Sequence, residues 1–384
     1  MKKLIYYWSP CLNKVATVKA TINSALSLSK YSKDYDVKII NVCGEWNNYK
    51  SYLQANNIGL EKLSFDYYNF LPKNGFIKSR ISYLIIILIS FIPLIVFLKN
   101  KKPDFFIIHL ITSLPLVLIN LLKSKTKIIL RISGFPKLNF LRKKLWKVSK
   151  KKIFKITCPT RDLKINLINN NIFEENKIIK LFDPVINISE FIKKKNDKNE
   201  NLIIKLDKPF FIAAGRLTKQ KNFIYLIGEF KKFLEIYPDE KLLIFGEGEL
   251  KSKILREIKL SNTSENIKLC GYTNNIYKYM VKSKAFILSS LWEDPGFVMI
   301  ESALCNTLII SSDCQNGPKE FLLNGKAGLI FKSNLKNELY NKLIEFKKSS
   351  EIDLYKKRIL AKKNSNNFTM FRHYKTLRQI LEND

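Results

Sequence analysis

Apolar and polar positions alternate along the chain in blocks of two lengths. Short, nearly continuous apolar runs have the length of buried strands, and the longer segments between them, such as residues 17–32, have the length of helices. In the first half the apolar runs lie at residues 3–8, 37–42, 104–110, 127–134 and 152–160. Apolar strands that alternate with helices are typical of a parallel sheet covered on both faces. The pattern therefore predicts an α/β fold.

The same alternation restarts in the second half, after a polar segment. Residues 187–208 are dense in Lys, Asn and Asp and predict a linker. Apolar runs follow at residues 209–215, 241–248, 267–272, 285–290, 307–313 and 327–331. We expect two Rossmann-like, doubly wound domains that face each other across a cleft at the carboxyl ends of their strands. The expected parts are domains at residues 1–186 and 209–365, the linker, and a helix at 366–384 that packs back on the first domain.

Length and charge add limits to this organisation. The 384 residues exceed the usual size of one domain, which agrees with two. A formal net charge of +34 attracts polyanions such as nucleic acids and anionic membranes. Lys, Asn, Ile, Phe and Tyr are all plentiful and share A/T-rich codons, so we ascribe most of the excess charge to composition. We expect no nucleic-acid partner.

The cysteines and the N-terminus indicate the compartment. Six cysteines form no C-x-x-C pair and lie mostly beside apolar residues, which predicts buried free thiols in a reducing compartment. The first twelve residues begin like a signal peptide, but Ser9 and Pro10 interrupt the apolar run and no small-residue cleavage site follows. We therefore expect a first strand at this position.

A strand that ends in glycine and is followed by cations marks the first candidate site. The predicted strand at residues 209–215 ends at Gly215, Arg216 follows it, and Lys221 and Asn222 open the next predicted helix. Two cations beside the free N–H groups of a helix start suit an anion such as a diphosphate. The alternative is a surface loop with ordinary lysines.

Two further turns follow strands of the same half. The Gly-rich turn that contains Gly246 is a fragment of a dinucleotide-binding fingerprint. The polar turn at residues 271–275 contains Tyr272 and Thr273. This second turn either offers backbone groups to a base or is only a turn.

Two glutamates flank a tight turn later in the chain. Glu293 and Glu301 lie eight positions apart, on either side of Pro295, Gly296 and the start of a predicted helix. Carboxylates on both sides of a tight turn are unusual in a chain with a formal net charge of +34, so the pair is a candidate site. The alternative is a capping acid and a solvated helix residue.

Residues 209–331 resemble the donor-binding domain of family 4 glycosyltransferases, which are retaining enzymes of the GT-B fold. The resemblance is carried by AAGRLTKQKN, IFGEGEL, LCGYTNN, LSSLWEDPGFVMIESALCNTLIISSD and NGPKEFLLNGKAGLIF, in the order and at the spacing of the family. It implies that the C-terminal domain binds a nucleotide-sugar donor and that the N-terminal domain binds the acceptor.

The resemblance also implies roles for single residues. Glu301 would hold the ribose hydroxyls, and Glu293 would hold hydroxyls of the transferred sugar. Arg216 and Lys221 would bind the diphosphate. At the turn, Gly296 would let the backbone approach closely. The donor-binding set implied in this way comprises Gly215, Arg216, Lys221, Gly246, Tyr272, Thr273, Glu293, Gly296, Phe297, Val298 and Glu301, with the N–H groups of Phe297 and Val298 meeting the phosphate or the sugar.

The first half resembles the family less sharply. Residues 101–110 match a family strand that ends in histidine, so His109 would face the donor sugar across the cleft. The alternative is a structural histidine, the commoner role of a lone His. The expected catalytic residues are His109, Arg216, Lys221 and Glu293.

We therefore expect a glycosyltransferase that moves a sugar from a nucleotide donor, a UDP-sugar, to a glycan or lipid-linked glycan in cell-surface polysaccharide biosynthesis. Fixed charges would stabilise the leaving diphosphate, and no metal or cofactor is expected. The alternative from another class is a basic, non-catalytic protein that binds membranes or nucleic acid and has a degenerate transferase fold.

Two segments bear on membrane contact. Residues 81–98 are uncharged and largely apolar, but strands of one predicted sheet precede and follow them, so they either pack as a buried helix or dip into one leaflet. Residues 137–155 contain nine basic and no acidic residues and predict a basic amphipathic helix, with Leu141, Leu145 and Val148 beside Trp146. We expect a cytoplasmic enzyme that is peripheral at the inner face of the membrane and binds anionic liposomes in a salt-sensitive way.

Overall fold

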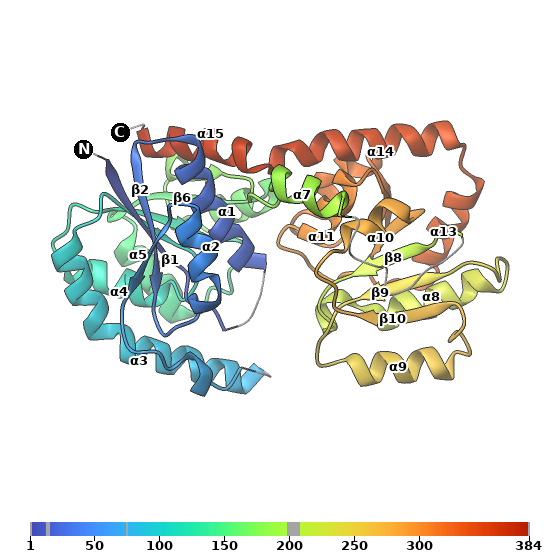
Figure 1. Cartoon of the computed structure of the whole chain (residues 1–384), viewed down its shortest axis with the longest axis horizontal. Coiled ribbons are helices and arrows are strands. Elements are labelled where there is room, and N and C mark those ends of the chain that lie inside the picture. The colour runs from blue at the N-terminus through green and yellow to red at the C-terminus, as the bar shows by residue number, and fades with distance from the viewer. Residues whose placement is uncertain (1, 13–15, 74–75, 198–207, 383–384) are drawn as a thin grey trace. The chain divides into compact units, whose positions relative to one another are not determined.

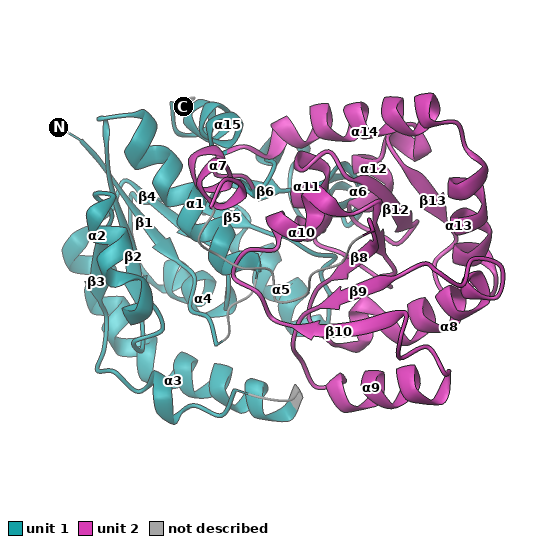
Figure 2. Cartoon of the chain, turned by 45° about the vertical axis from the view of Figure 1, so that its right-hand side comes forward, with its two compact units in different colours: residues 1–185, 370–384 teal, residues 186–369 magenta. Residues whose placement is uncertain are grey.

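The computed structural model describes residues 2–12, 16–73, 76–197 and 208–382. The chain divides into two compact units, which Figure 2 distinguishes by colour. Unit 1 comprises residues 1–185 and 370–384, and unit 2 comprises residues 186–369. Both units consist of a parallel sheet with helices on its two faces (Figure 1).

Unit 1 is built on a seven-stranded sheet with the order β3-β2-β1-β4-β5-β6-β7, in which every pair of neighbours is parallel. The strands are β1 (Lys3–Trp8), β2 (Tyr35–Asn41), β3 (Gly59–Lys62), β4 (Phe105–Ile108), β5 (Lys127–Arg131), β6 (Ile153–Cys158) and β7 (Ile178–Lys180). The helices are α1 (Ala16–Tyr31), α2 (Lys50–Ala55), α3 (Phe76–Lys101), α4 (Ser113–Leu121), α5 (Phe140–Ser149), α6 (Arg161–Asn169) and α15 (Met370–Glu382). The strand order reverses direction between β1 and β4, as in doubly wound folds.

Unit 2 is built on a six-stranded parallel sheet with the order β10-β9-β8-β11-β12-β13. The strands are β8 (Phe211–Ala214), β9 (Leu242–Phe245), β10 (Ile267–Gly271), β11 (Ala285–Leu288), β12 (Leu308–Ser312) and β13 (Leu329–Phe331). The helices are α7 (Ile188–Lys195), α8 (Phe223–Leu234), α9 (Lys251–Leu260), α10 (Tyr277–Lys282), α11 (Phe297–Leu304), α12 (Pro318–Phe321), α13 (Glu338–Lys348) and α14 (Glu351–Ser365).

The apolar runs from which strands were predicted do form strands, and they are apolar because both faces of each sheet are covered. Every residue of β4, β8, β9, β11 and β12 is buried. Burial of both faces needs apolar side chains at successive positions rather than at alternate ones. The predicted α/β class is therefore confirmed in both units. Five of the six cysteines are buried free thiols as expected, and Cys270 is half-buried.

Three expectations differ from the structure. The first part of the segment expected to be a linker forms helix α7, whose Phe191 packs edge-on against Tyr277, and residues 198–207 lie outside the described residues. The basic helix is shorter than residues 137–155, because α5 ends at Ser149 and β6 begins at Ile153. Trp146 is not on an exposed face of α5, because it is buried beside Phe173.

The C-terminal helix α15 packs on α1 within unit 1. Met370, Tyr374, Leu377, Ile380 and Leu381 of this helix are buried in the core that also contains residues of β1, β2 and α1. Unit 1 is therefore completed by a segment that is distant in sequence from the rest of it.

Candidate active site

The carboxyl ends of β8, β9 and β10 meet at one edge of the unit 2 sheet through three glycines. The N–H of Gly215 donates to the carbonyl of Phe245 over 3.0 Å, and the N–H of Gly246 donates to the carbonyl of Gly271 over 2.8 Å. A Cβ atom on Gly246, whose φ is +146°, would lie 1.9 Å from the carbonyl oxygen of Gly215. Only glycine therefore fits there, and the loops after the three strands lie side by side.

Lys221 and Glu293 form an ion pair at this edge. Lys221 lies in a short 3₁₀ turn before α8, and its Nζ lies 2.5 Å from Oε1 of Glu293. The hydroxyl of Ser290 donates to the same oxygen over 2.5 Å. The two charged side chains are only 12% and 5% exposed. A buried carboxylate needs such partners, so the pair fixes both side chains in place.

Arg216 and Gln220 complete the loop that follows β8. Arg216 is exposed, and its Nη2 lies 3.4 Å from Oε1 of Gln220. The side-chain amide of Gln220 donates to the carbonyl of Trp292 over 2.9 Å, which ties this loop to the one after β11. The structure thus pairs Lys221 with Glu293, 72 positions away, and joins the loop of Arg216 to the loop of Glu293 through Gln220.

The second glutamate lies on helix α11. Gly296 precedes this helix with a φ of +97°, a conformation that favours glycine, and Phe297 and Val298 are its first residues. The N–H groups of these two residues belong to the first turn, which has no intrahelical acceptors for them. Glu301 is half-buried and accepts a hydrogen bond of 3.2 Å from the hydroxyl of Tyr277. Burial and the neighbouring Glu301 raise the pKa of Tyr277, so this hydroxyl stays protonated and donates.

The polar turn after β10 is more open. Tyr272 is exposed, and Thr273 is half-buried, with its hydroxyl oxygen accepting from the N–H of Asn275 over 3.2 Å. The side-chain amide of Asn275 donates to the carbonyl of Lys194 in α7 over 2.8 Å. The turn is therefore held from within unit 2, while the ring of Tyr272 is free to meet a ligand.

His109 belongs to unit 1, whereas the other predicted site residues belong to unit 2. It follows β4, is buried, and has its Nδ1 3.0 Å from the hydroxyl oxygen of Thr21. Burial, with smaller contributions from Arg131 and His373, holds its pKa well below the ordinary value. His109 is therefore a neutral imidazole near pH 7, able to hydrogen-bond but not to act as a cation.

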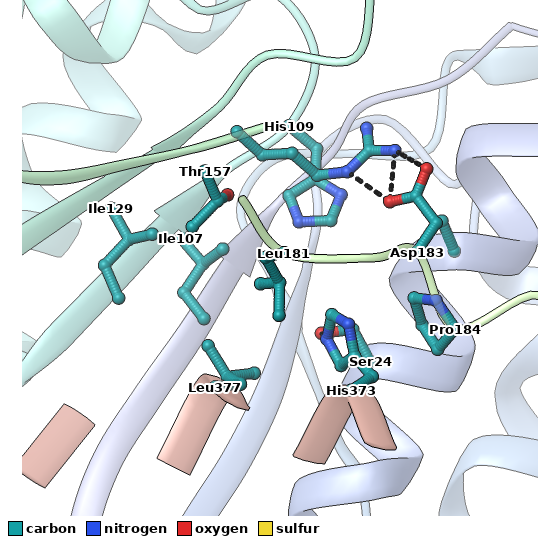
Figure 3. Close-up of a pocket in the computed structure, with 12 residues that line it drawn as sticks. Ser24, Ile107, His109, Ile129, Thr157, Leu181, Asp183, Pro184, His373 and Leu377 are labelled. Carbon is teal, nitrogen blue, oxygen red and sulfur yellow. Dashed lines mark hydrogen bonds and ion pairs between the residues drawn. The ribbon is translucent and has the colours of Figure 1, made fainter. Parts of the chain in front are cut away.

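His109 lines a small cavity together with a second histidine, His373 (Figure 3). Arg131 at the end of β5 forms a two-pronged ion pair with Asp183, with N–O distances of 2.6 to 3.0 Å. His373 of α15 lies between the carbonyl of Phe182, 2.7 Å from its Nδ1, and the hydroxyl of Ser24, 2.8 Å from its Nε2. Nδ1–H therefore donates to the carbonyl. Burial lowers the pKa of His373 to about 4, so the ring is neutral near pH 7 and Nε2 accepts.

Unit 1 is expected to lose stability in mild acid because of His373. In the unfolded chain this group takes up a proton as the pH falls below about 6.5, whereas in the folded chain its pKa is about 4. Protonation thus favours unfolding, and His373 alone should lower the free energy of unfolding by roughly 2–3 kcal/mol between about pH 7 and about pH 4.5. Buried His109 adds to this loss in the same direction. Urea denaturation at the two pH values measures this loss. A His373→Gln variant should show a smaller loss, and an unchanged loss would contradict the assignment.

The part of unit 2 that carries the strand-end site is similar to a known family. Residues 194–367 match the family model described as glycosyl transferases group 1. The match covers most of unit 2 and supports a glycosyltransferase. A solved TarM variant of Staphylococcus aureus, in complex with fondaparinux, alpha-GlcNAc-glycerol and UDP, superposes with a TM-score of 0.74 at 13% identity and covers 100% of both chains. The two Rossmann-like units thus form the GT-B fold of glycosyltransferases.

Two curated relatives are similar in sequence. An uncharacterized glycosyltransferase of Methanocaldococcus jannaschii is 32% identical over 241 residues, which are 59% of this chain and 59% of that protein. The N-acetylgalactosamine-N,N'-diacetylbacillosaminyl-diphospho-undecaprenol 4-alpha-N-acetylgalactosaminyltransferase of Campylobacter jejuni is 35% identical over 140 residues, 36% of this chain and 38% of that protein. The chain matches less than two thirds of the length of either relative.

Three residues of the site were not predicted from the sequence: Ser290, Gln220 and Tyr277. Ser290 and Gln220 lie within segments that carried the resemblance, directly after a strand or before a helix, where a polar side chain is a usable signal. Tyr277 offered no such signal, because its contact with Glu301 joins two helices, α10 and α11.

Proposed function

We propose that the chain is a retaining glycosyltransferase of family 4 type that transfers a sugar from a UDP-sugar to a glycan or lipid-linked glycan in cell-surface polysaccharide biosynthesis. The observation that carries this proposal is the buried Lys221–Glu293 pair beside exposed Arg216 at the strand ends of unit 2. The relatives lend support: UDP is bound in the TarM variant, and a diphospho-undecaprenol glycan is named for the Campylobacter enzyme.

The pair suits a donor with an anionic middle and neutral hydroxyls on either side. An ammonium has three N–H donors, so Lys221 can donate to Glu293 and also to diphosphate oxygens. Arg216, which is exposed at the same edge, supplies the second cation. As the bond between sugar and diphosphate breaks, charge grows on the leaving oxygen, and cations already held in place stabilise it without reorganisation.

The two glutamates take different parts of the donor in this proposal. Glu293 is held beside Lys221, so its second oxygen lies next to the diphosphate and suits hydroxyls of the transferred sugar. Glu301 on α11 suits the ribose hydroxyls, with Tyr277 orienting its carboxylate. Unit 1, which contains neutral His109, would bind the acceptor. We further propose that the enzyme is cytoplasmic and peripheral at the membrane, where a lipid-linked acceptor is presented.

Thermal stabilisation by candidate donors tests the assigned site. UDP and one UDP-sugar are expected to raise the melting temperature of the wild-type chain. At a ligand concentration of about 100 times Kd, the free energy of unfolding should rise by about 2.7 kcal/mol. The Arg216→Ala, Lys221→Ala double variant should lose this stabilisation, whereas a variant at exposed Lys219 in the same turn should keep most of it. Stabilisation by no nucleotide, or equal stabilisation of the double variant, would refute the donor site.

Transfer is expected to need no divalent metal. Arg216, Lys221 and the start of α11 already place positive charge where the diphosphate would lie, which is the role a metal ion plays in other transferases. Activity after treatment with EDTA and gel filtration should equal that of the untreated enzyme. If EDTA abolished transfer and Mg²⁺ or Mn²⁺ restored it, the charge assignment of the site would be wrong.

A further inference from the structure

Helix α3 of unit 1 is apolar on both of its faces. One face is buried in the unit 1 core and includes Ile86, Leu94 and Phe97. The opposite face exposes seven apolar side chains by 37% to 73%: Ile77, Ile81, Leu84, Leu88, Phe91, Ile92 and Val96. Apart from the adjacent Phe91 and Ile92, successive members lie three or four positions apart, so they form one continuous stripe along the helix. The helix runs along the edge of unit 1 (Figure 1). The stripe is called the α3 stripe below.

The α3 stripe is unusual for a surface in contact with water. Residues 81–98 contain no charged side chain, and only 33% of the most apolar window of α3 is buried. Of the two alternatives for residues 81–98, a buried helix or a segment that dips into one leaflet, the first does not fit this face. Contiguous apolar patches of this kind on a soluble chain mark surfaces that another phase or molecule covers.

The helix cannot cover its stripe by spanning a bilayer. α3 is long and apolar enough to cross a membrane by length and composition. However, β1 precedes α3 and β4 follows it, and these two strands pair directly, with Ile5 opposite Phe105. A single crossing would place paired strands on opposite sides of the membrane. The helix must therefore lie along whatever covers it.

The charge of the residues around α3 indicates what covers the α3 stripe. Residues 67–161 contain 20 Lys and Arg but a single acidic residue, Asp104. Within this stretch α3 packs on α4 and α4 packs on α5, where Lys143 and Lys144 are exposed. A second copy of the chain would bring the same positive charge against itself, whereas anionic phospholipid headgroups neutralise it.

We propose that the α3 stripe is a docking surface for an anionic phospholipid bilayer, with α3 lying in the plane of the membrane and its stripe in the boundary between headgroups and acyl chains. The lysines and arginines that flank the stripe along the chain would contact the headgroups. The proposal deepens the peripheral location that is part of the proposed function, because it names the surface and the lipid class. Apolar insertion would resist salt better than charge alone does.

Co-sedimentation with vesicles tests the α3 stripe. The wild-type chain should bind vesicles of phosphatidylcholine with phosphatidylglycerol, and bind phosphatidylcholine alone much more weakly. Replacement of Leu84, Leu88 and Ile92 by Gln should lower the partition coefficient by at least about tenfold, since three exposed apolar side chains would no longer enter the lipid. The matched control replaces Ile236, Leu255 and Leu260 of unit 2, which are similarly exposed, and should leave binding unchanged.

Two further variants separate insertion from charge attraction. Replacement of Lys143, Lys144, Lys150 and Lys151 by Glu should weaken vesicle binding at low salt. The variant with Gln in place of the three apolar residues of α3 should also lose the binding that persists at high salt. A Leu88→Trp variant should show a blue-shifted emission with anionic vesicles and quenching by lipids brominated in their acyl chains. The control Leu255→Trp should show neither effect.

Several outcomes would overturn the proposal. Equal vesicle binding by the wild-type chain and the Gln variant would exclude insertion of the α3 stripe. Absence of vesicle binding, together with a dimer that the Gln variant dissociates, would show that a second copy covers the stripe. Both readouts are taken without nucleotide sugar, so a chain that binds vesicles but transfers no sugar would refute the proposed activity and leave the docking surface intact.

Discussion

Replacement of Lys221 or Arg216 by alanine is expected to lower kcat/KM by roughly 30- to 1000-fold, the equivalent of about 2–4 kcal/mol. Each change removes a charged donor from the position where the leaving diphosphate develops its charge. The measurement is steady-state transfer from the donor identified by thermal stabilisation. Lys219→Ala, at an exposed position of the same 3₁₀ turn, is the matched control and should keep activity close to that of the wild type.

Loss of Lys221 has a structural consequence that must be separated from catalysis. Lys221→Ala leaves the carboxylate of Glu293, only 5% exposed, without its counter-ion, which destabilises a folded chain by several kcal/mol. Adding Glu293→Gln removes the buried charge and should restore much of the melting temperature. It should not restore transfer. A double variant that regained both stability and activity would show that Lys221 acts only through the fold.

The second large effect separates the two glutamates by the kinetic constant that each controls. Glu293→Ala should mainly lower kcat, because this carboxylate would touch the sugar that is transferred, whereas Glu301→Ala should mainly raise KM for the donor. We expect kcat to fall roughly 100-fold for Glu293→Ala, which loses a charged hydrogen bond at the reacting part of the donor. We expect KM to rise roughly 10-fold for Glu301→Ala, which loses one at a remote part of the donor.

Controls for the glutamates come from the same unit. Tyr277→Phe removes the hydroxyl that donates to Glu301 and should raise KM in the same direction but by less. Glu265→Ala, at an exposed position before β10, should change neither constant. Near-wild-type kinetics of Glu293→Ala, or a fall in kcat alone for Glu301→Ala, would contradict the roles assigned to these two glutamates.

Most of the fold could be predicted because burial on both faces leaves a strong signal in the sequence. Strands such as β9 and β12 are fully buried and read as unbroken apolar runs. β3 and β7 were not predicted. β3 is half-exposed at the sheet edge and so lacks an unbroken apolar run, and β7 has only three residues. Helix α7 was not predicted, because its lysines resembled those of a linker. Asn187 caps this helix by accepting from the N–H of Glu190, and an Asn before a helix is a signal in the sequence for a helix start.

The site was less predictable, because its contacts join segments that are far apart in the sequence. Each of Lys221 and Glu293 could be assigned toward a ligand, but their mutual pairing depends on how the loops after β8 and β11 pack. For α3, periodicity identified apolar faces and could not tell which one is covered, since both carry the same kind of side chain. Long-range packing, not local preference, decides such questions.

The most direct test of the account is nuclear magnetic resonance of a reaction that contains the stabilising UDP-sugar and a lipid-linked glycan acceptor. The account predicts that UDP accumulates together with a new glycoside whose anomeric configuration equals that of the donor. The stable Lys221→Ala, Glu293→Gln double variant should produce neither. Donor binding without formation of UDP would instead identify a non-catalytic binding protein, and a product of inverted configuration would contradict the retaining mechanism.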